Sequence, residues 1–181
     1  VEENGIDTIH NAAKEIDDEL RDSIIYDWYL KNSFIDHISD EYFLYDNFRY
    51  SNFHEYGDFA NQPFEVEYDQ KKITFSREGG FYLPQKVKAH LQKSYYPKSK
   101  GFDFEIKLST EAKGNFNYIL EHNFHFANYE TIKINGEPMI EKGILKQIQS
   151  IEIYDDNLKK NILIHLNHLC DVYYFPLKTL S

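Results

Sequence analysis

The segment 121–125, EHNFH, carries carboxylate and imidazole groups, which bind metal ions or transfer protons. Along an extended strand, successive side chains point to opposite faces, so His122 and His125 cannot share an ion. Glu121 and His125 share a face, but they stand about 13 Å apart on a regular strand. Without a bulge, two interpretations remain. Glu121, Asn123 and His125 form a polar row that hydrogen-bonds an extended ligand such as a sugar chain, or they form a plain solvated or interface face.

Other residue types that do chemistry give weaker patterns. His165 and His168 fail the same parity test, and the position of His168 on an apolar face predicts a hydrogen-bonded core histidine. Cys170, the only cysteine, shares that face and is predicted to be a small buried hydrophobe. Phosphate-loop, nucleophile-elbow, zinc and EF-hand motifs are absent from the sequence, so we expect no cofactor and no metal site. A carboxylate pair for glycoside hydrolysis can come from distant strands, and the sequence singles out no such pair.

The segment 42–59 is unusually aromatic, with rings at eight of its eighteen positions and Glu55 and Asp58 among them. No regular period organises these residues, which predicts a long ordered loop. Rings cover the apolar C–H faces of sugars and carboxylates accept from sugar hydroxyls, so one interpretation is sugar recognition. The other is a loop held over the core, or against a neighbouring domain, by its own rings.

The composition limits the class of protein. A chain of 181 residues with 41% hydrophobic content has ample surface to bury for one core. Its net charge of −10 argues against nucleic acid or an anionic membrane as the main partner. One cysteine allows no internal disulfide, and no run of 18 apolar residues predicts a transmembrane helix, so we expect a cytoplasmic setting.

The elements that position these groups are mostly strands. Apolar and charged residues alternate along 64–69, 86–91 and 102–108, which predicts half-buried strands; in the first, Phe64, Val66 and Tyr68 point inward and Glu65 and Glu67 face solvent. Longer strands are expected at 116–126 and 162–174, with a two-residue hairpin at Asn135-Gly136. Turn signals at 77–80, 96–101, 111–114 and 154–157 separate the strands. The pattern favours an all-β, antiparallel sandwich over 23–181.

The first 22 residues differ from the rest. Apolar residues recur at helical spacing from Ile9 to Leu20, which predicts one short N-terminal helix. The chain begins at Val1 and its only methionine is Met139, so we expect a fragment of a longer polypeptide, with the helix as a remnant of an upstream region. This lead-in, 1–22, is expected to precede a β-sandwich domain at 23–181.

Six stretches, taken in order, resemble one family: YDWYLKNSFIDHI (26–38), EYGDFANQPFEVE (55–67), ITFSREGGFY (73–82), VKAHLQKSYY (87–96), YILEHNFHF (118–126) and DVYYFPLKTLS (171–181). Together they are similar to the C-terminal domain of the α-amylase/4-α-glucanotransferase enzymes of glycoside hydrolase family 57. The resemblance implies a galactose-mutarotase-like supersandwich whose catalytic carboxylates lie in a preceding barrel. It implies an accessory, non-catalytic domain of an α-glucan-acting enzyme, with that barrel and α-glucan or maltooligosaccharide as partners. It also implies that the domain runs on beyond Ser181.

The resemblance supplies candidate site residues. Its signature positions are Asp36, His37, Gly57, Asp58 and Glu121, where Gly57 would serve a special backbone angle and the two aspartates would cap turns. With the loop residue Glu55 and the polar-row residue His125, the substrate-binding candidates are Asp36, His37, Glu55, Asp58, Glu121 and His125.

Two alternative functions remain open. A self-contained carbohydrate-binding module would use the aromatic segment 42–59. A sugar epimerase or lyase on the same sandwich would use His125 or His90 as general acid/base beside Glu121.

Overall fold

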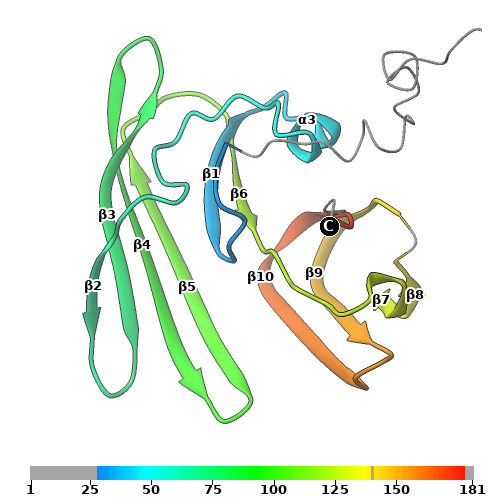
Figure 1. Ribbon diagram of the computed structural model, residues 1–181. Coiled ribbons are helices and arrows are strands. Elements are labelled where there is room, and N and C mark those ends of the chain that lie inside the picture. Colours follow the sequence, from blue (N-terminus) through cyan, green and yellow to red (C-terminus); the bar gives the residue numbers. More distant parts are fainter. Residues whose placement is uncertain (1–27, 140, 178–181) are drawn as a thin grey trace, which may run out of the picture. The chain divides into compact units, whose positions relative to one another are not determined.

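The computed structural model describes residues 28–139 and 141–177, and Figure 1 shows its course. Within these residues every strand pair is antiparallel, so the predicted all-β, antiparallel fold is confirmed. The predicted helix at 1–22 lies outside the described residues. The described residues fall into two compact units, one within 27–127 and the other within 128–177. No helix of the described part is long and apolar enough to cross a membrane.

The unit 27–127 contains a four-stranded sheet and a separate pair of strands. The sheet has the order β2-β3-β4-β5, and its strands are β2 (Glu65–Tyr68), β3 (Ile73–Tyr82), β4 (Lys86–Lys98) and β5 (Gly101–Thr110). The pair joins β1 (Ile35–Asp40) to β6 (Phe116–Glu121). A short helix, α3 (Tyr45–Arg49), lies in the connection between β1 and β2.

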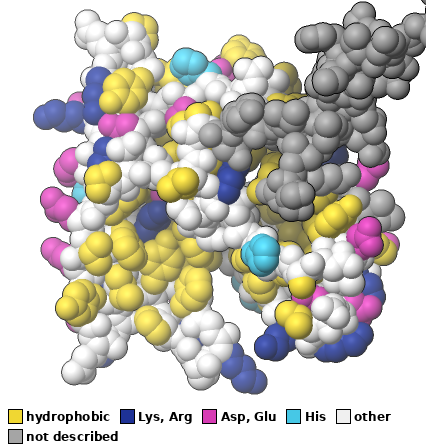
Figure 2. Space-filling view, viewed as in Figure 1, with side chains coloured by type: hydrophobic (Ala, Val, Ile, Leu, Met, Phe, Trp, Pro, Cys, Tyr) yellow, Lys and Arg dark blue, Asp and Glu magenta, His cyan; other side chains and the backbone are white. Residues whose placement is uncertain are grey.

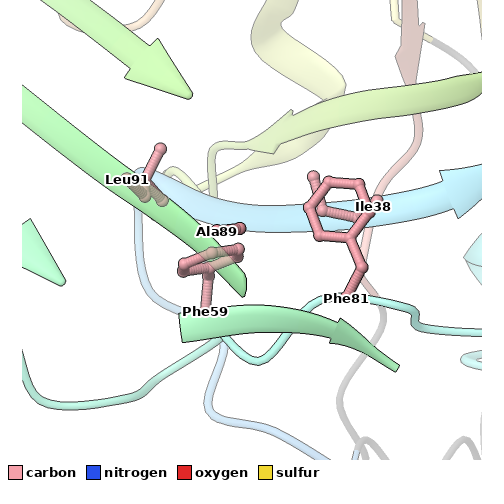
Figure 3. Close-up of a cluster of buried hydrophobic side chains, with 5 residues drawn as sticks. All are labelled: Ile38, Phe59, Phe81, Ala89 and Leu91. Atoms are coloured by element: carbon pink, nitrogen blue, oxygen red, sulfur yellow. The ribbon is translucent and has the colours of Figure 1, made fainter. Parts of the chain in front are cut away.

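The core of this unit lies between the β1–β6 pair and the four-stranded sheet. Figure 3 shows Ile38 of β1 with Phe81 of β3 and Leu91 of β4, together with Phe59 and Ala89. All five side chains are buried, and each large one contributes roughly 1.5–3 kcal/mol through loss of contact with water. The predicted alternation along β4 is confirmed, because Ala89 and Leu91 face this core.

One predicted turn is wrong. Arg77–Gly80 does not separate two strands but lies inside β3. The two glycines are needed for close packing. A Cβ on Gly79 would stand 2.7 Å from Cε1 of Phe59, and one on Gly80 would stand 2.7 Å from the carbonyl oxygen of Val87. Glycine within a strand therefore marks a close approach here, and not a chain reversal.

The predicted burial of β2 is also wrong. Strand pairing puts Val66 in one row with Phe75 and Lys93, on the face that carries the core. Val66 is nevertheless 52% exposed and Tyr68 82% exposed. The six-residue β1 covers about 20 Å of that face, whereas the thirteen-residue β4 extends over about 44 Å. Figure 2 shows the hydrophobic side chains that gather at the uncovered end of the sheet.

The strand predicted at 116–126 is shorter than expected. β6 ends at Glu121, and the residues that follow are not in a regular strand. Phe124 and Phe126 therefore do not continue its apolar face. Instead, the ring of Phe124 stacks on His122 with 6.0 Å between centroids. The predicted polar row of Glu121, Asn123 and His125 loses its basis, because it assumed an extended strand through His125.

The second unit contains a sheet of the order β10-β9-β7-β8. After a short 3-10 helix, η1 (Tyr129–Thr131), its strands are β7 (Ile132–Ile134), β8 (Glu137–Pro138), β9 (Gly143–Asp155) and β10 (Lys160–Tyr174). The hairpin predicted at Asn135-Gly136 is confirmed: it joins β7 to β8, and the two φ angles are 50° and 88°. The buried residues of this sheet include Ile132 of β7 and Ile151 of β9.

Two predictions on β10 are wrong. His168 is exposed and is not a core histidine, and Cys170 is only half-buried. The pairing of β9 with β10 shifts register between His165 and Cys170. Because an irregularity changes which face each later residue occupies, counting alternate residues from the start of the strand fails beyond this point.

Candidate functional site

The aromatic segment 42–59 is not a continuous loop, because α3 (Tyr45–Arg49) lies within it. Only Phe48 of this five-residue helix is buried. One turn with one buried residue has no repeating apolar pattern, which explains why the sequence did not predict it. The rings of Phe48 and Phe53 lie 4.8 Å apart and both pack against His37 of β1.

Strand β1 separates two sets of buried polar groups. Its pairing with β6 places His37 opposite Ile119 and Asp36 opposite Leu120, and neighbouring residues of a strand face opposite sides. Asp36 and Ile38 therefore face the four-stranded sheet, whereas His37 faces the segment 42–59. Asp36 and His37 are both almost fully buried.

The imidazole of His37 is held between two carboxylates. Its Nδ1 lies 2.7 Å from Oε2 of Glu55, and its Nε2 lies 3.0 Å from Oε2 of Glu121. The side chain is 0% exposed. The rings of Trp28 and Tyr29 also lie against it, with centroids 6.3 Å and 4.9 Å away.

Glu55 and Glu121 connect this histidine to other segments. Oε1 of Glu55 accepts from the backbone N–H groups of Ile38 and Gly57, each at 2.8 Å. Glu121 accepts from the hydroxyl of Tyr29 at 2.6 Å, and its Oε1 lies 3.1 Å from Nζ of Lys31. We call the set Tyr29, Lys31, His37, Glu55 and Glu121 the histidine cluster. It fixes the segments before β1 and after α3 to the β1–β6 pair.

The electrostatics of the histidine cluster favour charged groups. Burial opposes protonation of His37, but the hydrogen bonds to Glu121 and Glu55 outweigh burial and raise its pKa above the ordinary value. Burial alone would raise the pKa of Glu121; hydrogen bonds from His37, Tyr29 and Asn123, with the charge of Lys31, instead lower that pKa to about 2. A protonated His37 donates from both nitrogens, so it has no lone pair with which to act as a base.

The other face of β1 carries a buried ion pair. Nζ of Lys93 donates to Oδ2 of Asp36 at 2.5 Å and to the carbonyl oxygen of Phe34 at 2.8 Å. The hydroxyl of Tyr118 donates to Oδ1 of Asp36 at 2.6 Å. Burial and the charge of Asp36 raise the pKa of Tyr118 well above its ordinary value. Asp36 therefore joins β1 to β4, and the prediction that it caps a turn is wrong.

Phe34, just before β1, has a φ of 61°, which is unusual for a bulky residue. The Lys93 bond to its carbonyl oxygen helps hold this backbone conformation. The ring of Phe34 packs edge-on against His122, with 4.3 Å between the ring centroids. Burial and the charge of Lys93 lower the pKa of His122 to about 4, although Glu121 acts in the opposite direction. His122 is therefore neutral near pH 7.

Asp58 forms a third, separate connection. It accepts from the backbone N–H of Gly80 at 2.8 Å and from Nζ of Lys86 at 2.8 Å, and so links its segment to β3 and β4. The prediction that Asp58 caps a turn is wrong, as is the special angle predicted for Gly57, whose φ is not positive. A Cβ on Gly57 would stand 2.9 Å from Cγ1 of Ile38, so close packing is the reason for this glycine.

The remaining candidates do not join these sets. His125 is exposed and makes no hydrogen bond or ring contact within the described residues. His90 pairs with the exposed Glu78 at 2.7 Å. Neither histidine is among the hydrogen-bond or ion-pair partners of Glu121 within the described residues, so the structure gives no support to the epimerase or lyase arrangement. The structure brings together three of the six candidates, namely His37, Glu55 and Glu121.

The chain is similar to known proteins over almost its whole length. The family model described as "Alpha-amylase/4-alpha-glucanotransferase, C-terminal" matches residues 1–181. The chain belongs to this family. It is 30% identical over 99% of its length to a 4-alpha-glucanotransferase of Thermococcus litoralis, of which it covers 26%. It is 25% identical over 99% of its length to an alpha-amylase of Pyrococcus abyssi, of which it covers 25%.

A solved structure shows the same relationship. The crystal structure of the Thermococcus litoralis 4-alpha-glucanotransferase matches with a TM-score of 0.81 at 27% identity, over 94% of this chain and 25% of that one. The chain of this family member therefore spans about a quarter of the length of the curated relatives that it matches. The resemblance found in the sequence blocks is confirmed.

Sequence reasoning missed several residues of this amylase/glucanotransferase domain. Lys93 lies on the apolar face of β4 between Leu91 and Tyr95, and a lysine at such a position signals a buried carboxylate partner. Tyr29 and Lys31 lie in one of the blocks that carry the resemblance, but nothing local marks them as partners of Glu121. Within 28–139 and 141–177, no group of three or more histidine, cysteine or acidic side chains is placed to bind a metal ion.

Proposed function

We propose that this chain is the accessory, non-catalytic C-terminal domain of a family 57 glycoside hydrolase or 4-α-glucanotransferase that acts on α-glucans in the cytoplasm. The observation that carries the proposal is the match itself: nearly the whole chain aligns with about a quarter of a 4-alpha-glucanotransferase. The remaining three quarters of such a polypeptide would supply the catalytic barrel.

The histidine cluster supports a structural role for the signature residues. A catalytic acid or base must come within hydrogen-bond reach of its substrate. His37 is 0% exposed and both of its nitrogens lie against carboxylates, so it holds segments together and does not meet a glycosidic bond. Asp36 is likewise committed to Lys93 and Tyr118.

The uncovered end of the four-stranded sheet supports a larger polypeptide. Val66 and Tyr68 lie there with Ile73 and Phe102, and each of them is exposed. Alternation of apolar and charged residues is typical of a sheet face that another layer covers. The relatives are about four times as long as this chain. In this proposal, the rest of a polypeptide of similar length covers these exposed residues.

The experiment compares the 181-residue chain with a longer polypeptide, which includes this chain and the residues that the gene encodes beside it. Each is assayed for glucan transfer on maltotriose and for hydrolysis of soluble starch, after circular dichroism and a thermal melt have shown that it is folded. We expect no product from the 181-residue chain and turnover by the longer polypeptide. Turnover by the short chain that Glu121→Gln abolishes would overturn the proposal, as would a flanking sequence without catalytic carboxylates.

A further inference from the structure

A hollow of about 380 Å³ lies where the end of β1 meets the segment around α3. This volume falls within the range of roughly 300–1,000 Å³ that small-molecule sites occupy. Its lining residues all belong to the unit 27–127, and none of the six candidate residues is among them. The sequence analysis therefore did not select the residues of this hollow as site candidates, although all of them except Ser39 and Asp40 lie in the aromatic segment 42–59.

The polar groups of the hollow are suited to hydroxyl-rich ligands. Asn47 and Asn52 line it, and their side-chain amides make no hydrogen bond within the described part of the chain. Each amide can both donate and accept, as each sugar hydroxyl does. Asp40 also lines the hollow; one of its oxygens accepts from the backbone N–H of Tyr42 at 2.9 Å. A carboxylate at this position accepts strongly from a hydroxyl.

The rings of the hollow supply apolar contact. Tyr42 is 77% exposed, which is a large fraction for an aromatic side chain in a folded domain. Its ring offers a flat surface for the C–H face of a pyranose. Phe53 also lines the hollow and is half-buried. Rings beside amides and a carboxylate form the combination that recognises a sugar, because they match its apolar faces and its hydroxyl edge at once.

Part of the lining of the hollow packs against the histidine cluster. The ring of Phe53 lies 5.4 Å from that of His37, and the backbone N–H of Asn52 donates to the carbonyl oxygen of Asn47 at 2.7 Å. The lining is thus held in position before any ligand arrives. A preformed site loses less entropy on binding and gains affinity for that reason.

We propose that this hollow binds a short stretch of an α-1,4-linked glucan chain. The choice of a sugar follows from the rings, amides and carboxylate of the hollow itself. The choice of α-linked glucose rests on the proposed function. Tyr42 provides the stacking surface, and Asn47, Asn52 and Asp40 bind the hydroxyl groups.

Isothermal titration of the 181-residue chain with maltoheptaose tests this proposal. We expect a dissociation constant on the order of 1 mM, with at least a roughly tenfold weakening in Tyr42→Ala and in the double variant Asn47→Ala/Asn52→Ala. The matched control is Tyr68→Ala, which removes another exposed ring of the same unit, outside the hollow. It should bind like the unchanged chain.

Three outcomes would overturn the proposal. The first is no heat of binding at maltoheptaose concentrations up to about 20 mM. The second is a Tyr68→Ala variant that binds as weakly as Tyr42→Ala. The third is equally tight binding of cellohexaose, a result that would remove the assignment to α-linked glucan. Circular dichroism of every variant shows whether it is folded. These outcomes do not depend on catalysis, so they are separate from the activity assay that tests the proposed function.

Discussion

The two faces of β1 use buried charge in different ways. Towards the four-stranded sheet, Asp36 meets Lys93 in one short ion pair completed by Tyr118. On the opposite face, His37 lies between Glu55 and Glu121 in a cluster that reaches several segments. The ion pair joins two strands of the core, whereas the cluster holds the segments before β1 and after α3 to the β1–β6 pair.

The difference shows two ways in which buried charge can stabilise a fold: as a single ion pair, and as a cluster of several charged groups. A single buried pair depends on both partners, because removing one leaves the other charged and unsatisfied. The histidine cluster spreads its charge over more groups, and each carboxylate has other donors when one is lost. We therefore expect the ion pair to be the more sensitive of the two to a single substitution, and the cluster to be the more sensitive to pH.

The largest effect is expected at the ion pair. Lys93→Met leaves Asp36 buried without its cation, which costs about 3–5 kcal/mol of the free energy of unfolding. Urea unfolding followed by circular dichroism measures this loss. The double variant Asp36→Leu/Lys93→Met removes both charges and should recover part of the stability. A double variant no more stable than Lys93→Met would contradict the assignment.

The next effect concerns the cluster in acid. The pKa of Glu121 is lowered to about 2 from 4.5, so its contribution is present above pH 4.5 and is lost as the pH falls towards 2. A shift of this size corresponds to about 3 kcal/mol. Urea unfolding at steps between pH 5 and pH 2 measures the slope. Glu121→Gln should flatten it, and an unchanged slope in that variant would assign the acid sensitivity to other groups.

A smaller effect is expected for Glu55→Gln. The amide oxygen keeps the bonds from Ile38 and Gly57, but the charged contact to His37 is lost, at a cost of about 1.5–3 kcal/mol. The raised pKa of His37 stabilises the fold fully below pH 6.5, and this stabilisation is lost as the pH rises through that raised pKa. Unfolding between pH 6 and pH 9 should therefore show a weaker decline in Glu55→Gln. A steeper decline in the variant would contradict this arrangement.

The smallest effect sets the reference for charge at the surface. Glu78→Gln breaks the pair between Glu78, which is exposed, and His90, which is half-buried at the surface. Water screens such pairs and they contribute little, so the unfolding midpoint in urea should not change measurably. A loss comparable to that of Glu55→Gln would remove the distinction between buried and exposed pairs on which the comparison rests.

The sequence predicted the positions of the strands better than it predicted which strand residues are buried. Alternation located β4 and β5, and the Asn135-Gly136 pair located the hairpin, because both signals are local. Alternation also put Val66 on the core face, yet the shorter β1 leaves that residue exposed. The glycines of Arg77–Gly80 were interpreted as a turn, since sequence does not distinguish a reversal from a close approach by Phe59.

The candidate site was predicted in part. The family resemblance selected His37. Both the resemblance and the EHNFH stretch selected Glu121, while the aromatic segment drew attention to Glu55. The sequence did not show that these three residues meet, because they come from β1, β6 and a connection between strands. Asp36 was selected for the wrong role, since its partner Lys93 lies 57 positions away.

By itself, the sequence determined the all-β class and the family, because local alternation, turn residues and ordered blocks encode them. Only the tertiary structure decided that the signature residues are buried and paired, that β6 ends at Glu121, and that Asp40, Tyr42, Asn47 and Asn52 surround one hollow. The physical reason is that ion pairs, burial and hollows depend on contacts between distant segments. Those contacts are fixed when β1 and β6 pair and pack over the four-stranded sheet.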